Sequence, residues 1–191
     1  MITRMLEVGP GYSPLAEAHE GEFNWAEFPN SDYTAVQPAT PWHVFPDDLR
    51  ALPNVTYIEA PLQSAGLADA SFDEVFAGNV LSDPDLTRQR PDMLRHMARV
   101  LRSGGLMTLL DTYTPEHGLS AEALIDFFAS DSHQHFSLRQ TMRVYPLQGE
   151  VMQVPSPNWV ATAGAYSHII RHNYRHGAPT YIGRFTQLVK H

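Results

Sequence analysis

The segment LEVGPGYSPL, residues 6–15, decides the fold that this sequence predicts. The preceding apolar run, residues 2–8, reads as a strand, and Gly9-Pro10-Gly11 breaks it. Ser13-Pro14 then starts a helix that we expect to end near residue 20, because serine caps helices and proline suits their first position.

The glycine turn has two interpretations. Glycines two positions apart let the backbone turn sharply and let a ligand approach it closely. The helix start directs free N–H groups into the same space. The segment is therefore either a simple tight turn of an α/β protein or part of a cofactor site. The dinucleotide fingerprint G-x-G-x-x-G is not met, because residue 14 is proline, and NAD is therefore disfavoured.

Strands and helices alternate along the rest of the chain. The expected strands cover residues 33–37, 55–59, 72–77, 106–110, 142–146 and 184–189. The expected helices start at Asp47 and Ser120 or cover residues 91–102 and 159–176, and Gly104-Gly105 is expected to end the helix over 91–102. This order predicts an α/β fold, a doubly wound, mostly parallel sheet with helices on both faces. The ligand of such a sheet lies beyond the carboxyl ends of its strands.

Composition excludes several classes of protein. The chain has 191 residues and a net charge of -8, which argues against wrapping nucleic acid through phosphate contacts. It has no cysteine, which removes disulfides, thiolate zinc sites and a cysteine nucleophile. We find no signal peptide and no run of about 18 apolar residues, and we expect a cytoplasmic protein with no membrane partner. No acidic residue follows Glu150, so the basic residues of 151–191 either pack against the acidic body or bind an anionic group.

Three segments, in order, resemble the class I S-adenosylmethionine-dependent methyltransferases. LEVGPGYSPL resembles that family's motif I, in which an E/D-x-G-x-G stretch ends the first strand. LADASFDEVFAGNVL (67–81) resembles the segment through its fourth strand, and MLRHMARVLRSGGLMTLLDTY (93–113) resembles its fourth helix, Gly-Gly turn and fifth strand. The resemblance implies a Rossmann-like fold and S-adenosyl-L-methionine as cofactor. We expect a single domain over residues 1–191, with a cofactor-binding core over 1–113 and a substrate-facing part over 114–191.

The resemblance also implies which residues contact the cofactor. Glu7, Gly9, Pro10 and Gly11 would hold the amino-acid end, Gln37 the ribose hydroxyls, Leu62 and Gln63 the adenine side, and Asn79 the amino group. Gln37 and Pro61 depart from the family, which usually has acids there. Gln37 can still exchange hydrogen bonds with hydroxyls but gives up a charge-assisted bond. Trp42 either stacks on the adenine or packs as an ordinary tryptophan.

The candidate catalytic residues follow the fourth and fifth strands. Methyl transfer from a sulfonium is an in-line displacement, which needs positioning and exclusion of water above all. A general base helps where the acceptor must lose a proton. Asp83, Tyr113 and His117 are the candidates for this role, and the alternative interpretation of Asp83 is a cap of a helix or loop.

The histidines raise a metal hypothesis. His168, His172 and His176 recur every fourth residue and would share one helix face. Because arginines interleave and no carboxylate follows Glu150, we expect a solvated or substrate-facing stripe and no metal site. Some members of the wider family hold a divalent metal on carboxylates after the fourth and fifth strands, and Asp83 and Asp111 could mimic two of these ligands.

The sequence therefore predicts a methyltransferase that acts on an oxygen or nitrogen atom of a small-molecule metabolite. The alternative is a protein of the same fold that binds the cofactor weakly or not at all and serves as a partner subunit or a non-methylating enzyme. Methylation of a protein or RNA is a third hypothesis, and the acidic body argues against RNA. Because the first strand begins at residue 2, the substrate site is either open, covered by a homodimer or partner subunit, or built for a large substrate, with residues 142–180 as lid material.

Overall fold

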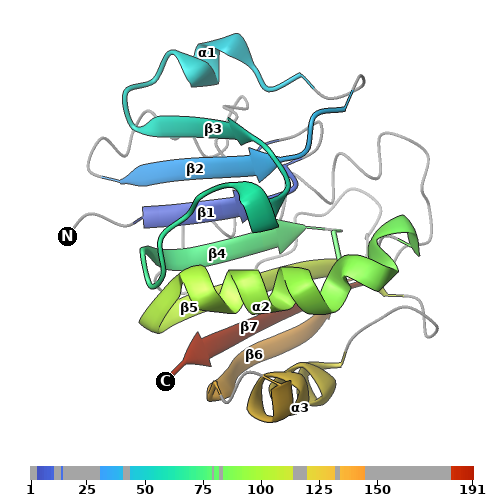
Figure 1. The fold of residues 1–191 in the computed structure, drawn as a ribbon. Coiled ribbons are helices and arrows are strands. Elements are labelled where there is room, and N and C mark those ends of the chain that lie inside the picture. The colour runs from blue at the N-terminus through green and yellow to red at the C-terminus, as the bar shows by residue number, and fades with distance from the viewer. Residues whose placement is uncertain are drawn as a thin grey trace.

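The protein is built on one seven-stranded sheet with the strand order β3-β2-β1-β4-β5-β7-β6 (Figure 1). The computed structural model describes residues 4–10, 14, 31–40, 44–78, 80–81, 84–113, 120–131, 134–144 and 182–191. The strands are β1 Arg4–Val8, β2 Asp32–Gln37, β3 Val55–Glu59, β4 Phe72–Gly78, β5 Leu101–Tyr113, β6 Phe136–Val144 and β7 Ile182–Lys190. The pairs among β3, β2, β1, β4 and β5 are parallel, and β7 is antiparallel to both β5 and β6. The predicted mostly parallel α/β fold is confirmed.

Helices lie over one face and at the edges of this sheet. They are α1 Asp47–Arg50, α2 Arg90–Val100 and α3 Ala121–Asp131, with 3₁₀ helices η2 Leu62–Ser64 and η3 Pro84–Gln89. In Figure 1, α2 crosses one face of the sheet, α1 lies beyond β3 and α3 lies beside β6. No helix within these described ranges is both long enough and apolar enough to cross a membrane.

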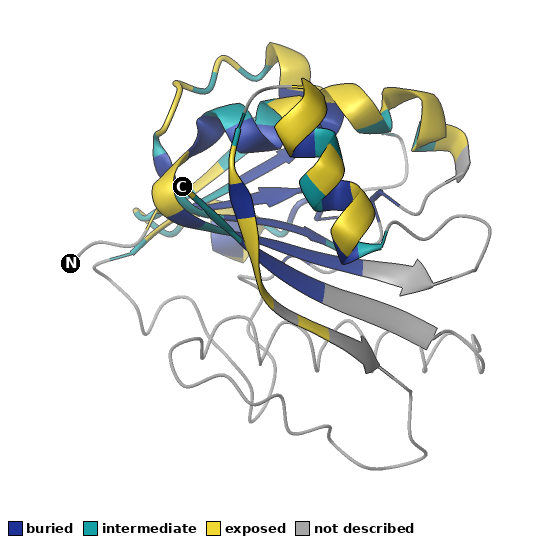
Figure 2. Cartoon of the chain, turned by 90° about the horizontal axis from the view of Figure 1, so that it is seen from below, coloured by how far each residue is buried: buried dark blue, intermediate teal, exposed yellow. Residues whose placement is uncertain are grey.

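The core forms where α2 meets the sheet. The helix α2 buries one apolar face, which includes Met93, Leu94, Met97 and Ala98 at helical spacing, and it also buries Val100. Alternating strand residues such as Leu6, Val36 and Val75 complete the same cluster. Figure 2 shows the buried residues on the strands and on the inner sides of the helices, with exposed residues outside. The apolar pattern of the sequence thus fixes which face of the sheet α2 covers.

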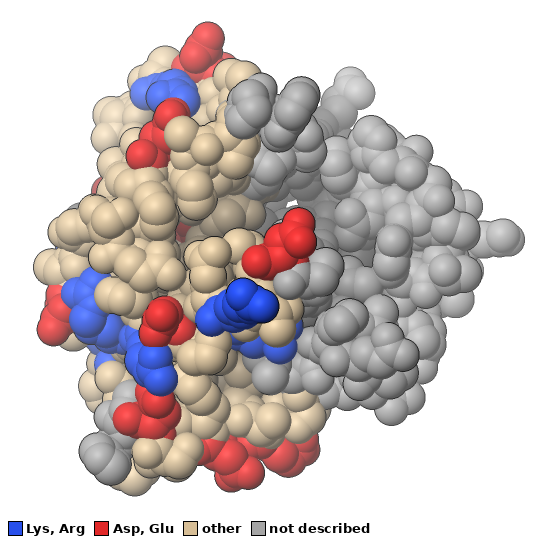
Figure 3. Space-filling view, turned by 45° about the vertical axis from the view of Figure 1, so that its right-hand side comes forward, with Lys and Arg blue, Asp and Glu red and all other residues tan. Residues whose placement is uncertain are grey.

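The outer surface of α2 carries arginines paired with aspartates. Arg95 contacts Asp92 at 2.5 Å and Asp131 of α3 at 2.6 Å. Arg99 pairs with Asp69, which precedes β4, and Arg102, at the start of β5, pairs with Asp73 of β4. Figure 3 shows such cations and anions side by side on the described surface. These exposed pairs orient α2, but each stabilises the fold only modestly.

The predicted end of this helix is wrong. Gly104-Gly105 does not end α2, which stops at Val100, and Leu101 is already extended at φ -76° and ψ 129°. The ammonium of Lys190, from β7, donates to the carbonyls of Ala98 and Leu101 at 2.7 and 2.8 Å. These bonds satisfy carbonyls at the end of the helix, so no glycine cap is needed there.

The strand predicted near residues 142–146 begins earlier. β6 starts at Phe136, whose ring stacks on Phe128 of α3 with 4.3 Å between ring centroids. A short apolar pattern does not predict this contact between α3 and β6, because it depends on how the two elements pack. The predicted helix over residues 14–20, apart from its first residue, and the one over 159–176 lie outside the described residues.

Candidate functional site

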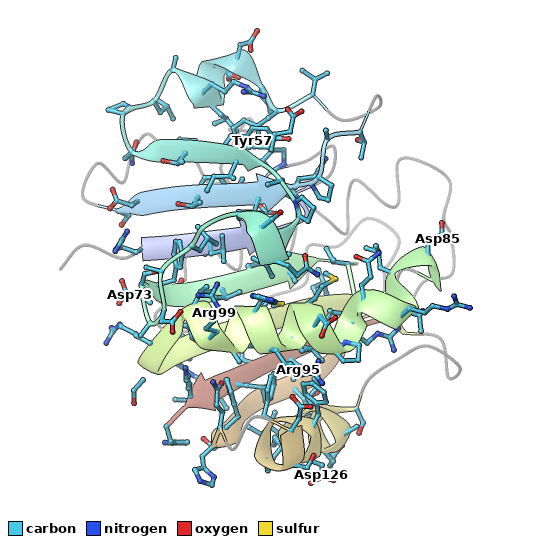
Figure 4. The ribbon with its side chains drawn as sticks, in the orientation of Figure 1. Tyr57, Asp73, Asp85, Arg95, Arg99 and Asp126 are labelled. Carbon is cyan, nitrogen blue, oxygen red and sulfur yellow. The ribbon has the colours of Figure 1, made fainter. Side chains whose placement is uncertain are left out.

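The candidate site lies at the carboxyl ends of the parallel strands. The chain passes from β1 to β2 and β3 on one side, then crosses to β4 and β5 on the other. β1 and β4 are therefore the neighbours at which strand order reverses, and loops leaving them separate there. In Figure 4, Asp85 lies at this edge, whereas Asp73 and Arg99 lie at the opposite one. Ligands of open α/β sheets bind at such a reversal point.

Gly9 forms the turn that leaves β1. Its φ of +68° is in the left-handed region, which favours glycine. Its N–H donates to the carbonyl of Val36 at 2.9 Å, which ties the turn to the end of β2. A Cβ at this position would lie 2.6 Å from Cγ2 of Val80, in the loop after β4. Gly9 therefore joins the ends of three adjacent strands, and no other residue type fits without strain.

Glu7 carries the buried carboxylate of this edge. The residue is 2% exposed and pairs in register with Ala35 of β2 and Phe76 of β4. The hydroxyl of Tyr33, which is itself fully buried, donates to Oε2 of Glu7. A buried carboxylate needs such donors, because burial otherwise disfavours its charged form.

Gln37 ends β2 at the same edge. It is 5% exposed and pairs in register with Glu59 of β3. Three residues later, the hydroxyl oxygen of Thr40 is buried and lacks a hydrogen-bond partner within the described structure. One polar side chain therefore ends this strand and a second one follows it.

The loop after β3 is fixed by its own hydrogen bonds. The Pro61 carbonyl accepts the N–H of Ser64 at 2.9 Å and its hydroxyl at 3.2 Å. The intervening η2 buries Leu62, which is 4% exposed, and leaves Gln63 exposed. Leu62 belongs to the core cluster, and Gln63 is exposed.

Several predicted site residues lie outside the described residues. They are Gly11, Asn79, Asp83, His117, Trp42 and the three histidines at 168, 172 and 176. Tyr113 ends β5, and Asp111 lies two residues earlier in the same strand. Pro10 is buried beside Gly9. The structure thus brings together Glu7, Gly9 and Gln37 at one edge, with Leu62 and Gln63 in the loop beside them.

Among the described residues, no three metal-ligating side chains of His, Asp or Glu converge.

Sequence reasoning missed three residues near this edge. Val80 gives no sequence signal, because its contact with Gly9 depends on how closely two loops approach. Tyr33 could have been found, since strand alternation puts it on the same face as Ala35 and Gln37. Arg90, the first residue of α2, has its Nε and Nη2 atoms buried, and within the described structure neither has a hydrogen-bond partner.

Comparisons with known proteins agree with this architecture. A methyltransferase domain family matches residues 6–109, which is more than half of the chain. No curated protein sequence matches the chain.

Solved structures share the fold at low sequence identity. The [4+2]-cyclase SpnF has a TM-score of 0.60 and 14% identity, over 99% of this chain and 74% of that one. An arsenic(III) S-adenosylmethionine methyltransferase from Chlamydomonas reinhardtii has a TM-score of 0.54 and 18% identity, over 98% of this chain, which spans 63% of that enzyme's length. A putative methyltransferase in complex with the Haloferax volcanii Trm112 activator has a TM-score of 0.57 and 16% identity, over 98% and 82% of the two chains.

The similarity to solved structures shows the fold, whereas the family match shows which family the sequence belongs to. The matched segment contains the glycine turn, all of the strands from β2 to β4, and α2. The chain therefore belongs to the class I S-adenosylmethionine-dependent methyltransferase family, whose enzymes take S-adenosylmethionine as their cofactor.

Proposed function

We propose that this chain transfers a methyl group from S-adenosylmethionine to an oxygen or nitrogen atom of a small-molecule metabolite. The observation that carries the proposal is the left-handed turn at Gly9, which stands where strand order reverses, with Glu7 and Gln37 buried beside it. The donor set suits this cofactor: a carboxylate for an ammonium group, an amide for ribose hydroxyls, and the apolar Leu62 for a base.

The proposed cofactor contacts follow the order of the strands. Glu7, Gly9, Pro10 and Gly11 hold the amino-acid end, Gln37 the ribose, Leu62 and Gln63 the adenine side, and Asn79 the amino group. When bound, the cofactor supplies a sulfonium methyl group. The chain's own groups orient it and exclude water, which is the main requirement of an in-line displacement.

Three residues are proposed to act on the acceptor. Asp83 follows β4 in the sequence, Tyr113 ends β5 and His117 follows it. Loops after these two strands border the same edge of the sheet as Gly9. One of the three side chains would take the proton that an oxygen or nitrogen acceptor loses.

The proposed organisation is a single domain over residues 1–191, with the cofactor core in 1–113 and substrate contacts in 114–191. A partner subunit or homodimer covering the site is part of this proposal. The complex of a structurally similar methyltransferase with its Trm112 activator supports it. The cytoplasmic location stays a prediction.

Calorimetric titration with S-adenosylmethionine and with S-adenosylhomocysteine tests the proposal. We expect both to bind with micromolar dissociation constants, because several polar groups and one apolar neighbour would contact each ligand. Heat changes that stay at the dilution level up to millimolar ligand would reject it.

The alternative function is a member of this fold that binds the cofactor weakly or not at all and serves as a partner subunit or a non-methylating enzyme. Two observations favour it: an uncharged Gln37 and a Pro61 stand where the family usually has acids. A cyclase, SpnF, also shares this fold.

The substitution Gln37→Asp separates the two functions. If a working pocket exists, a carboxylate at this position gains a charge-assisted bond to the ribose, and the dissociation constant of S-adenosylhomocysteine falls about 10-fold. Ala51→Asp, which adds a carboxylate at the exposed residue that follows α1, is the control and should change binding much less. Equal, negligible effects of both substitutions favour the alternative.

A further inference from the structure

We propose that Tyr33 is a positioning residue of the cofactor site, which holds the Glu7 carboxylate in place below the Gly9 turn. The inference rests on the proposed function, because it concerns how this chain prepares its carboxylate for the cofactor's ammonium group. Glu7 lies in β1, two residues before Gly9, at the end of the strand that leads into the turn.

The strand register brings the two side chains together. Glu7 of β1 pairs with Ala35 of β2, and Tyr33 lies two residues earlier on β2. Residues two apart in a strand share a face, so Tyr33 and Glu7 lie on the same face of the sheet. Leu6 and Val36, with the opposite alternation, belong to the core under α2. The Tyr33–Glu7 hydrogen bond therefore lies on the sheet face opposite α2 and is one of the interactions of each residue.

Burial makes this hydrogen bond consequential. Glu7 is 2% exposed and Tyr33 fully buried, so water contributes little to the solvation of the carboxylate. A donor to the charged form favours ionisation, which counteracts the effect of burial. An ionised carboxylate in a low-dielectric setting attracts an ammonium group more strongly than one in water does.

Other titratable groups on this face make the hydroxyl more important. Glu74 of β4 pairs with Met5 and so lies on the same face, one pleat from the row of Glu7. A like charge there disfavours ionisation of Glu7. On β3, Tyr57 and Glu59 pair with Ala35 and Gln37 and share the face. Among these groups, Tyr33 donates a hydrogen bond to Glu7.

A double-mutant cycle tests the inference. Tyr33→Phe, Glu7→Gln and the double variant are compared with the unsubstituted chain by calorimetric titration with S-adenosylhomocysteine and by urea unfolding. We expect Tyr33→Phe to weaken binding about 10-fold, the size of one hydrogen bond to a charged group. We also expect this loss to grow as the pH is lowered from about 8 to 6, because the carboxyl then protonates more easily. In the Glu7→Gln background, removing the hydroxyl should have little further effect on binding.

The matched control is Tyr57→Phe, which removes one hydroxyl from the neighbouring strand and should leave binding and its pH profile unchanged. A Tyr33→Phe variant that binds like the unsubstituted chain overturns the inference, and so does coupling that shows only in unfolding. If Tyr33→Phe does not fold, unchanged binding by Glu7→Gln still overturns the inference, because the carboxylate that Tyr33 would position is then not used by the ligand. Failure of the unsubstituted chain to bind would instead reject the proposed function.

Discussion

Gly9 is the residue on which the geometry of the site depends most directly. Its left-handed backbone lets its N–H reach the carbonyl of Val36, and the space that a side chain would occupy holds Val80. The turn after β1 and the loop after β4 therefore approach each other closely at Gly9. Two separate physical requirements, conformation and space, make this position glycine.

Gly9→Ala should destabilise the chain by about 2–4 kcal/mol, which combines left-handed strain with overpacking against Val80. Gly66→Ala is the matched control, because Gly66 has the same φ of +68° with nothing within 4 Å of a Cβ. It should cost only the strain, about 1 kcal/mol. Urea unfolding of both variants measures the difference, and equal losses would show that the Val80 contact has no energetic weight.

Glu7 and Gln37 show how far single residues could be predicted. Both were expected at strand ends from the sequence alone, and both are buried there. The Tyr33 hydrogen bond and the Val80 contact were not expected, because they depend on register and on loop approach between separate strands. A pattern along one strand says which face a residue takes, but not which residue of the next strand meets it.

At the scale of elements, strands were predicted better than their connections. The predicted strand over 55–59 coincides with β3, and the helix predicted over 91–102 corresponds to α2 apart from its end. The end of α2 and the start of β6 were wrong, because Lys190 and Phe136 set them through contacts with distant residues. Gly104-Gly105 instead serves β5, where a Cβ on Gly105 would lie 2.9 Å from the carbonyl of Asp73.

Lys190→Met tests the role of β7 in ending α2. The substitution keeps an apolar stem and removes the donors to Ala98 and Leu101, so we expect a loss of about 1–2 kcal/mol of unfolding free energy. Arg139→Met removes an exposed cation from β6 and serves as the control, with little expected change. Thermal and urea unfolding measure both. A Lys190 variant as stable as the control would contradict the account of how α2 ends.

At one edge of the sheet, strand β3 carries an aromatic residue that titrates, Tyr57. At β3, the Tyr57 ring stacks on Phe45 with 4.5 Å between centroids, and the Arg50 guanidinium lies 4.5 Å from the Tyr57 ring centre. Burial raises the pKa of the Tyr57 phenol, Glu59 raises it further and Arg50 opposes both. The folded state thus keeps this proton at a higher pH than the unfolded chain does.

The consequence is a loss of stability in alkali. Because the folded pKa is raised, the stabilising contribution of Tyr57 is complete below about pH 10 and is lost as the pH rises through the folded value. Urea unfolding between roughly pH 9 and 11 should show a steeper decline for the unsubstituted chain than for Tyr57→Phe. Parallel declines would mean that this phenol titrates alike in both states.

The most direct test of the central claim is a crystal structure of the chain with S-adenosylhomocysteine. We expect the ligand beyond the carboxyl ends of β1 and β4, with its amino-acid end over the Gly9 turn and its ribose beside Gln37. Density for the ligand at another place, or side chains filling the space above that turn, would contradict the account.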